Sequence, residues 1–366
     1  MEITGNATTQ ITIAQVPPPG RRKKPDNENA LGFGRFFCDH MFRMEWVEGE
    51  GWGDAVVEQY APLSLDPATL ALHYGQTVFD GFKIFRSASG GFNVFRPYKY
   101  LERLNLSADR LSMPPVEPQT LVEALKIMLS LDHEWAPRAE NTALYVRPLM
   151  FASEPFIGVK SSSQFTLVMF LSPVGAYYPE GFAPVKIRVC GKYARAGRGG
   201  LGAAKTPANY AASILAAKEA REAGYSQVLW LDSCESRYVE EVGAMNIFFK
   251  IGGKVVTPSL NGSILAGVTR DSVIRILESW GISVEERRLS MEEVTAAHAT
   301  GQLDEAFGSG TAAVIAPVGA LEYEGRLMEI NEGKTGPLAQ RLFTEITAIQ
   351  YGKKQDPFGW NYRVEV

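Results

Sequence analysis

Short apolar runs alternate with amphipathic segments along the first half of the chain. Residues 143–149 and 165–171 are almost continuously apolar, which is typical of strands buried on both faces. Residues 99–112 and 120–131 repeat apolar positions at helical spacing, which predicts two amphipathic helices. With a further strand at residues 92–95, this pattern predicts a smaller α/β domain over residues 31–172.

The second half repeats the alternation with its own strands and helices. A strand at residues 185–190 is followed by a glycine-rich loop, an alanine-rich helix from about Asn209 that ends at Gly224, and a strand at 227–232. Further on, Gly252-Gly253 between apolar runs predicts a β-hairpin, residues 269–280 have helical spacing, and Ser290 with Glu293 predicts a capping box. We therefore expect a larger α/β domain over residues 185–366.

Two segments lack this periodicity. Residues 173–184 are dense in proline and glycine, which predicts a connection between the two domains. Residues 1–30 are polar and contain several prolines, so we expect an extended N-terminal arm that is loosely ordered or draped over the fold.

Composition narrows the possible functions. A chain of 366 residues with 45% hydrophobic and 21% charged residues is typical of a globular protein with two domains. A net charge of -4 provides no positive electrostatic field that would attract nucleic acid. No apolar stretch approaches the length of a membrane span. The three cysteines are widely spread and the four histidines lack ligand spacing, so neither a disulfide framework nor a metal site is expected. We expect a cytoplasmic protein.

Lys205 is one long amine among small residues, in the segment Gly197-Arg-Gly-Gly-Leu-Gly-Ala-Ala-Lys-Thr-Pro-Ala-Asn-Tyr210. Small neighbours leave room for a bulky group, and a lysine in a confined place can form a Schiff base with an aldehyde. Taken alone, however, the segment fits a surface lysine in a flexible loop more readily.

Two other segments have the character of anion sites. Gly267-Val-Thr-Arg270 stands at the start of a predicted helix, and Gly308-Ser-Gly-Thr311 lies between two strand-like runs. Backbone N–H groups at a helix N-terminus, beside a hydroxyl group, bind phosphate or carboxylate. The same residue types also serve simply as caps and turns.

Glu241 is a carboxylate just ahead of a run that has no charge until Lys250. Such a carboxylate can pair with a heterocyclic nitrogen and keep that ring protonated. The plain alternative is an exposed glutamate in a hairpin.

In the first half, Tyr145 and Arg147 lie two positions apart on an apolar strand, so their side chains share one face. The arginine needs a partner there, which is either a buried acid of the protein or a substrate carboxylate. Arg103, in the predicted helix at 99–112, has a surface position by default.

One competing motif is Gly197-x-Gly199-x-x-Gly202, which matches a dinucleotide-binding fingerprint between a strand and a helix, with Asp232 ending the next strand. In that fingerprint the glycines follow the strand directly and open the helix. Here six residues separate Cys190 from Gly197, and the helix is delayed past Pro207.

Taken together, the motifs resemble those of fold-type IV pyridoxal-phosphate aminotransferases, and in detail the branched-chain amino-acid aminotransferases. The resemblance spans nearly the whole chain and rests on segments that include Phe33-Gly-Arg-Phe-Phe-Cys-Asp-His40, Leu72-His-Tyr-Gly75, Val78-Phe-Asp-Gly81, Tyr145-Val-Arg-Pro148, Pro173-Val-Gly-Ala-Tyr177, Lys205 with Tyr210, Glu241-Val-Gly-Ala-Met-Asn246, Gly267-Val-Thr-Arg270 and Phe307-Gly-Ser-Gly-Thr-Ala312. It implies a two-domain α/β (α+β) fold and pyridoxal 5'-phosphate as cofactor.

The resemblance also implies roles for single residues. Lys205 would hold the cofactor and act as base and acid in turn, Tyr210 would bind its phenolic oxygen, and Glu241 its pyridine nitrogen. The phosphate would be bound by Arg103, Val268, Thr269 and Thr311. The substrate carboxylate would meet backbone groups of Thr311 and Ala312. The substrate side chain would lie among Phe33, Tyr74, Phe79, Tyr145, Arg147 and Tyr177, with Tyr74 coming from the other subunit of a homodimer.

The implied reaction is reversible amino transfer between leucine, isoleucine or valine and 2-oxoglutarate, giving the branched 2-oxo acid and glutamate, as in branched-chain amino-acid biosynthesis. The sequence departs from the family pattern at a few positions. Ala313 and Ala316 replace the Cys-x-x-Cys pair of the animal enzymes, so redox control through that pair is not expected. Ala244 replaces a common threonine and Asp80 a common glutamate, which puts the fine substrate preference in doubt.

Three alternatives stay open from sequence. A lyase or D-amino-acid transaminase of the same fold would share Lys205, Glu241 and the phosphate segments, although the Tyr145-Val-Arg147 strand favours the branched-chain type. An NAD-dependent oxidoreductase would use the glycine fingerprint. A phosphate-binding module without catalysis would need neither Lys205 nor Glu241.

Overall fold

The computed structural model describes residues 10–17, 20–175 and 181–366, which fold into two compact units. The first unit contains Met1–Gly175 and Gln350–Val366, and the second contains Ala176–Ile349. The boundary falls inside the predicted connection at 173–184, although strand β9 still includes Pro173 and Val174.

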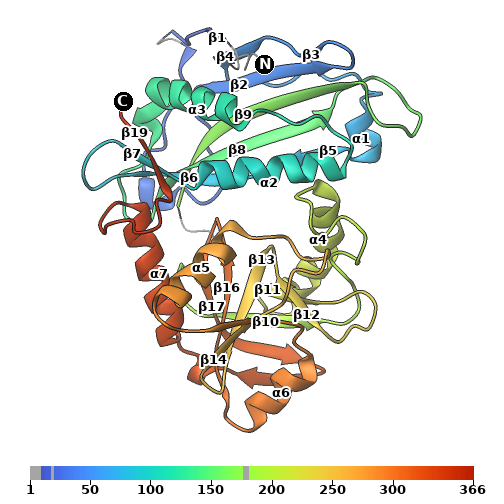
Figure 1. Ribbon diagram of the computed structural model, residues 1–366, viewed down its shortest axis with the longest axis vertical. Coiled ribbons are helices and arrows are strands. Elements are labelled where there is room, and N and C mark those ends of the chain that lie inside the picture. Colours follow the sequence, from blue (N-terminus) through green and yellow to red (C-terminus); the bar gives the residue numbers. More distant parts are fainter. Residues whose placement is uncertain (1–9, 18–19, 176–180) are drawn as a thin grey trace, which may run out of the picture. The chain divides into compact units, whose positions relative to one another are not determined.

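The first unit is built on one large sheet, shown with its helices in Figure 1. Its strands run in the order β1-β4-β2-β9-β8-β6-β7-β19, with β3 beside β2 and β5 beside β8. Their bounds are β1 Ile11–Ile13, β2 His40–Val47, β3 Gly51–Trp52, β4 Ala55–Gln59, β5 Thr77–Phe79, β6 Phe82–Arg86, β7 Phe92–Phe95, β8 Ala143–Ala152, β9 Gln164–Val174 and β19 Asn361–Val364.

Two helices pack against this sheet. Helix α2 (Pro97–Arg110) packs beside α3 (Pro118–Asp132), and these helices contact strands β5, β2 and β4. Strands β8 and β9 are buried along almost their whole length, which agrees with their nearly continuous apolar sequence. The predicted strands at 92–95, 143–149 and 165–171 and both predicted helices are confirmed, with small differences at their ends.

The described part of the N-terminal arm is attached to this sheet. Strand β1 pairs with β4 in parallel, and the Val16 N–H donates to Nε2 of the buried His40 over 3.1 Å. Nδ1 of His40 lies 2.8 Å from Asp132. Residues around β1 therefore form an edge strand, which agrees with an arm draped over the fold, and His40 has a structural role.

The C-terminal segment also belongs to the first unit, so the predicted second domain of 185–366 is wrong at its end. Strand β19 pairs with β7 in antiparallel register, with Asn361 opposite Phe95 and Val364 opposite Phe92. Its backbone forms the edge of the first sheet beside β7. A strand of four residues with mixed polarity carries too little periodicity to be assigned from sequence.

The second unit is organised around a closed ring of strands. The order is β12-β11-β10-β17-β16-β13, and β12 also pairs with β13, which closes the ring into a small barrel. The bounds are β10 Val185–Cys190, β11 Gln227–Leu231, β12 Val239–Val242, β13 Met245–Ile251, β16 Leu303–Gly310 and β17 Val314–Tyr323. Strands β14 (Lys254–Thr257), β15 (Val284–Glu286) and β18 (Arg326–Glu329) extend the sheet beyond the ring.

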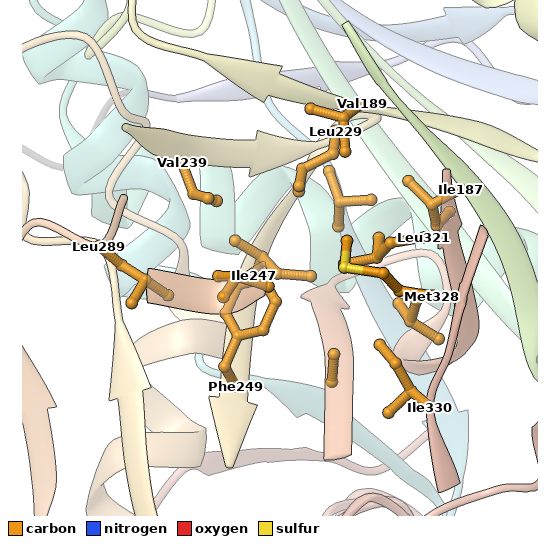
Figure 2. Close-up of a cluster of buried hydrophobic side chains, with 14 of the residues drawn as sticks. Ile187, Val189, Leu229, Val239, Ile247, Phe249, Leu289, Leu321, Met328 and Ile330 are labelled. Carbon is orange, nitrogen blue, oxygen red and sulfur yellow. The ribbon is translucent and has the colours of Figure 1, made fainter. Parts of the chain in front are cut away.

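Aliphatic side chains fill the core of this unit, as Figure 2 shows. Ile187, Leu229, Ile247 and Phe249 are completely buried there, together with Met328 from β18. A barrel closed by so few strands has an interior that side chains fill, so this core is a support for the site and not a channel.

Helices connect the strands of the second unit much as the sequence predicts. Helix α4 (Pro207–Glu222) joins the parallel strands β10 and β11, and Gly224 follows it with a φ of 85°. Helices α5 (Val268–Ser279), α6 (Met291–Ala299) and α7 (Pro337–Gln350) follow. Oγ of Ser290 caps α6 by accepting the Glu293 N–H over 3.2 Å, and the Gly252-Gly253 hairpin joins β13 to β14. Among the described residues, no helix is both long and apolar enough to cross a membrane.

Candidate active site

Lys205 is held in place at the start of helix α4. Its Nζ donates a hydrogen bond of 2.6 Å to Oη of Tyr210, one turn into the helix. The amide of Asn209 donates to the carbonyl oxygens of Leu201 and Ala204, over 2.8 and 2.9 Å, which fixes the loop ahead of the lysine. Lys205 is half-buried and bonded, so the alternative of a surface lysine in a flexible loop is wrong.

Glu241 lies in the hairpin that closes the barrel. Strands β12 and β13 pair Glu241 with Asn246, and the carboxylate is only 3% exposed. Its Oε1 accepts the Leu265 N–H over 2.7 Å and lies 3.2 Å from Nη2 of Arg195. The alternative of an exposed hairpin glutamate is therefore right about the hairpin and wrong about the exposure, because Glu241 is buried.

These two contacts of Glu241 use the same oxygen. Oε2 has no hydrogen-bond partner among the residues that the structure describes. Burial raises the pKa of Glu241, whereas the positive charge of Arg195, the Leu265 N–H and the charge of Lys205 favour the ionised form. The second oxygen is thus available to a group that carries a proton.

A narrow pocket brings these residues together within the second unit. Its lining residues are Arg195, Ala204, Asn209, Tyr210, Ser213, Glu241, Gly243, Ala244 and Leu265. The hydroxyl group of Tyr210, bonded to the Lys205 amine, and the carboxylate of Glu241 therefore face one space. Such a set can hold a ring that has an aldehyde, a phenolic oxygen and a basic nitrogen.

The glycine fingerprint has a packing role here. A Cβ atom on Gly202 would lie 2.1 Å from the carbonyl oxygen of Ser263, so only glycine permits the close approach of the two loops. Strand β10 ends at Cys190 and helix α4 begins at Pro207, so the glycines neither follow the strand directly nor open the helix. This geometry does not match a dinucleotide-binding turn.

The two predicted anion segments lie on either side of Asn246. Asn246 is paired with Ser309 across β13 and β16, and a Cβ atom on Gly267 would lie 2.0 Å from Oδ1 of Asn246. Gly267 is the N-cap residue of α5, with Val268 and Thr269 in its first turn. Thr311 and Ala312 follow β16 directly. The fold therefore brings the N-terminus of α5 near the Gly308–Thr311 segment.

In the first unit, four of the predicted substrate residues form one cluster. The Arg147 guanidinium lies 4.9 Å from the ring centre of Phe79 and 5.2 Å from that of Tyr145, and it donates to Oη of Tyr145 over 3.2 Å. Phe33 packs edge-on against Tyr145. Nε of Arg147 is buried without a hydrogen-bond partner among the described residues. We call Phe33, Phe79, Tyr145 and Arg147 the aromatic cluster.

The remaining predicted residues of this unit lie in other settings. Arg103 is buried and forms a two-bond ion pair with Asp80, at 2.9 and 2.6 Å. The hydroxyl group of Tyr74, in helix α1 (Leu70–Tyr74), donates to the carbonyl oxygen of Ile157, and its side chain is partly exposed. Tyr177 lies outside the described residues.

The sequence did not single out three charged or polar residues of these two sites. Asn246, the last residue of the segment Glu241–Asn246, lies opposite Glu241 in the hairpin of β12 and β13. Arg195 also stands beside Glu241 but belongs to no recognisable local pattern. Lys83 is buried opposite Tyr145 on the neighbouring strand, where burial lowers its pKa to about 8. Arg195 and Lys83 become neighbours of these residues only in the folded chain. No group of histidine, cysteine, aspartate and glutamate side chains suited to a metal occurs in the described ranges.

Comparison with known proteins places this geometry in a family. The amino-transferase class IV family model matches residues 77–321. Branched-chain-amino-acid aminotransferase 2 of Bacillus subtilis is 52% identical, over 97% of this chain and 98% of its own. The chain belongs to the branched-chain amino-acid aminotransferases, within class IV.

Solved aminotransferases of this family have the same fold. The branched-chain aminotransferase of Escherichia coli matches with a TM-score of 0.73 and 29% identity, covering 88% of this chain and 99% of that one. A thermophilic archaeal enzyme, that of Thermoproteus uzoniensis, was solved with norvaline and matches with a TM-score of 0.72 and 27% identity, over 88% of this chain and 100% of its own. The predicted fold class is thereby confirmed for this aminotransferase.

The close approach at Gly202 predicts that even one methyl group is harmful there. Gly202→Ala should lower the free energy of unfolding by about 1–3 kcal/mol, because the Ser263 backbone would have to shift. Gly191→Ala is the control, since a Cβ atom there meets nothing within 4 Å, and it should change stability by less than about 0.5 kcal/mol. Denaturant unfolding measures both; equal stabilities would contradict the packing role.

Proposed function

We propose that this aminotransferase is a pyridoxal-phosphate-dependent branched-chain amino-acid transaminase. It moves an amino group reversibly between leucine, isoleucine or valine and 2-oxoglutarate. The observation that carries the proposal is the pocket lined by Tyr210 and Glu241, with the Lys205 amine hydrogen-bonded to the Tyr210 hydroxyl group. The full-length similarity to Bacillus subtilis branched-chain-amino-acid aminotransferase 2 supports the substrate class.

The residues of the second unit fit the cofactor. Lys205 would hold it covalently, Tyr210 would donate to its phenolic oxygen, and Oε2 of Glu241 would accept a hydrogen bond from its ring nitrogen. When bound, pyridoxal phosphate supplies a protonated ring that draws electrons from the carbon being deprotonated. A similar branched-chain aminotransferase, 27% identical, was solved as a complex with N-(5'-phosphopyridoxyl)-L-glutamate, which supports this assignment.

Phosphate binding is assigned to the N-terminus of α5 and the segment after β16. Val268 would act through its backbone N–H, and Thr269 and Thr311 through hydroxyl or backbone groups. Arg103, whose guanidinium is paired with Asp80, is assigned to the phosphate only by the family resemblance. Helix α5 has twelve residues, so its dipole favours an anion at that end. Thr311 and Ala312 would also offer backbone groups to the substrate carboxylate.

The protein's own contribution to the chemistry is proton transfer. The amine of Lys205 takes the proton from the substrate α-carbon and returns a proton in the second half of the reaction. Its hydrogen bond to Tyr210 orients Nζ for both tasks. Glu241, held by Leu265 and Arg195, keeps its charge aimed at the ring nitrogen throughout.

The aromatic cluster explains how two different side chains are accepted. Its rings offer apolar surface to leucine, isoleucine or valine, whereas Arg147 offers a charged partner to the distal carboxylate of glutamate. When an aliphatic side chain is bound, the guanidinium keeps its contacts with Phe79 and the Tyr145 hydroxyl group, so it is not left without partners.

A second copy of the chain is the proposed partner. Ile157 and Val159 are 70% and 84% exposed, and Leu72 and Phe156 are exposed as well. Tyr74 is tied to this apolar patch through Ile157. So many exposed apolar side chains in two short segments are typical of a protein interface, and Tyr74 would then reach the partner's substrate.

Replacement of the lysine tests the proposed reaction. Lys205→Ala should reduce amino transfer from leucine to 2-oxoglutarate by at least roughly 10²–10⁴, because the amine proposed to move the proton is removed. Lys218→Ala, on the exposed side of α4, should leave the rate unchanged. A Lys205→Ala enzyme that keeps full activity would show that the lysine is wrongly assigned.

The role of Arg147 predicts a selective effect. Arg147→Met should raise the KM for 2-oxoglutarate about 10- to 150-fold, as expected for the loss of a hydrogen bond to a charged group, and change the KM for leucine far less. Arg138→Met, at an exposed position, should change neither constant. Equal losses for both substrates would argue against carboxylate recognition by Arg147.

Sedimentation tests the proposed homodimer. The wild-type chain of 40.2 kDa should sediment at twice its mass, and Val159→Glu should shift it to the monomer because a charge is poorly accommodated in an apolar interface. Leu327→Glu, at an exposed apolar position on β18, is the matched control. A wild-type monomer would refute the proposal.

A further inference from the structure

Strand β12 carries two consecutive buried acids, and only Glu241 has a part in the proposed function, on which this inference rests. Glu240 is 3% exposed, as is Glu241. One arginine, Arg195, serves this pair, and its ion pair is with Glu241 at 3.2 Å. The charge of Lys205 also acts on Glu241, so an ionised Glu240 would be the acid without a cation of its own, which is costly for a buried charge.

The hydrogen bonds around Ser263 show where a proton must be. Oδ1 of Asn261 accepts the Ser263 N–H over 3.0 Å, which identifies that atom as the amide oxygen. Oγ of Ser263 lies 2.6 Å from the same Oδ1 and also contacts Oε1 of Glu240, and either oxygen can accept its hydrogen. The hydroxyl group has one hydrogen, so it cannot donate to both oxygens at once. A proton on Glu240 lets both contacts be hydrogen bonds, with the serine donating to Asn261 and accepting from Glu240.

The other oxygen of Glu240 supports the same conclusion. Oε2 is buried and has no hydrogen-bond partner in the described part of the chain. An ionised carboxylate would leave part of its charge there without any donor, whereas a neutral carboxyl group leaves only a carbonyl oxygen.

The two charged groups that face Glu240 change its pKa in opposite directions: Asp232 raises it and Arg195 lowers it. Asp232, at the end of β11, accepts backbone N–H groups from residues 234–238 and opposes a second negative charge nearby. Arg195 acts in the other direction. Burial is the largest influence and raises the pKa of Glu240.

We infer that Glu240 is held protonated, as a positioning residue that fixes the loop at 261–265 and leaves Arg195 to Glu241 alone. Three hydrogen bonds fix the loop. Glu240 bonds to the Ser263 hydroxyl group, Arg195 donates to the Ser263 carbonyl oxygen, and Glu241 accepts the Leu265 N–H. The same loop leads into Gly267 and the N-terminus of α5. A neutral acid therefore orders the loop without competing for the arginine.

The pH dependence of stability tests the protonation state in the full-length protein as purified. A carboxyl group that keeps its proton when folded but loses it when unfolded makes the folded state less stable as pH rises through this window. Glu240→Gln removes that effect and is isosteric with the neutral acid. The melting temperature of Glu240→Gln relative to the wild type should therefore increase from about pH 5 to about pH 8.

Each other outcome contradicts the inference. If the melting temperature of Glu240→Gln relative to the wild type stays constant or falls as pH rises, Glu240 is ionised in the folded protein. A Glu240→Gln chain that fails to fold would also refute it, because a neutral isostere should replace a neutral acid.

The pH profile of kcat/KM tests whether Arg195 stabilises the charge of Glu241 rather than that of Glu240. Glu240→Gln should leave the acid limb in place, whereas Arg195→Met should move it upward by roughly one pH unit or more, because Glu241 loses the cation that favours its charge. Arg195→Lys should return the acid limb most of the way to its wild-type position, because lysine supplies a cation. Equal shifts in Glu240→Gln and Arg195→Met would overturn the inference.

If the purified protein lacks pyridoxal phosphate, the proposed function fails while the stability test still reports on Glu240.

Discussion

The candidate active site depends on the closure of the barrel by strand β12. Because β12 pairs with both β11 and β13, a strand of four residues is fixed along both edges and its side chains have defined directions. That closure sets Glu241 opposite Asn246, and Asn246 in turn lies beside Gly267 and opposite Ser309. One short hairpin thus connects the carboxylate that we propose for the ring nitrogen with both segments proposed for the phosphate.

The balance of buried charge is the second principle of the site. Buried charges are costly unless they are paired, and the two buried acids of β12 have one arginine, Arg195, beside them. Assigning the charge to Glu241 and the proton to Glu240 satisfies both the hydrogen-bonding geometry and this balance. In the first unit, Arg147 is surrounded by aromatic rings and one hydroxyl group, so its charge is available to a substrate that brings a carboxylate.

Much of the fold followed from local sequence patterns. The central strands, helices α2 to α6 and the glycine hairpin all have strong periodicity or caps, and each formed close to its predicted position. The short strands β1 and β19 did not, because an edge strand of three or four residues depends on a distant partner. The extent of the domains was therefore mispredicted at the C-terminus.

The site was predictable to the extent that its residues belong to motifs. Lys205, Tyr210 and Glu241 could be named from sequence because small residues, a tyrosine five positions on and an uncharged run mark them. Arg195 and Glu240 carry no such mark. Their roles come from loops that meet only in the folded chain, as the contact between Gly202 and Ser263 illustrates.

The most direct test of the account is to find the residue that holds the cofactor. The purified protein should be yellow, and borohydride should bleach it while fixing the cofactor permanently to one peptide. Mass spectrometry of that peptide should place a reduced phosphopyridoxyl group on Lys205. A colourless protein, or a label on a different lysine, would contradict the account.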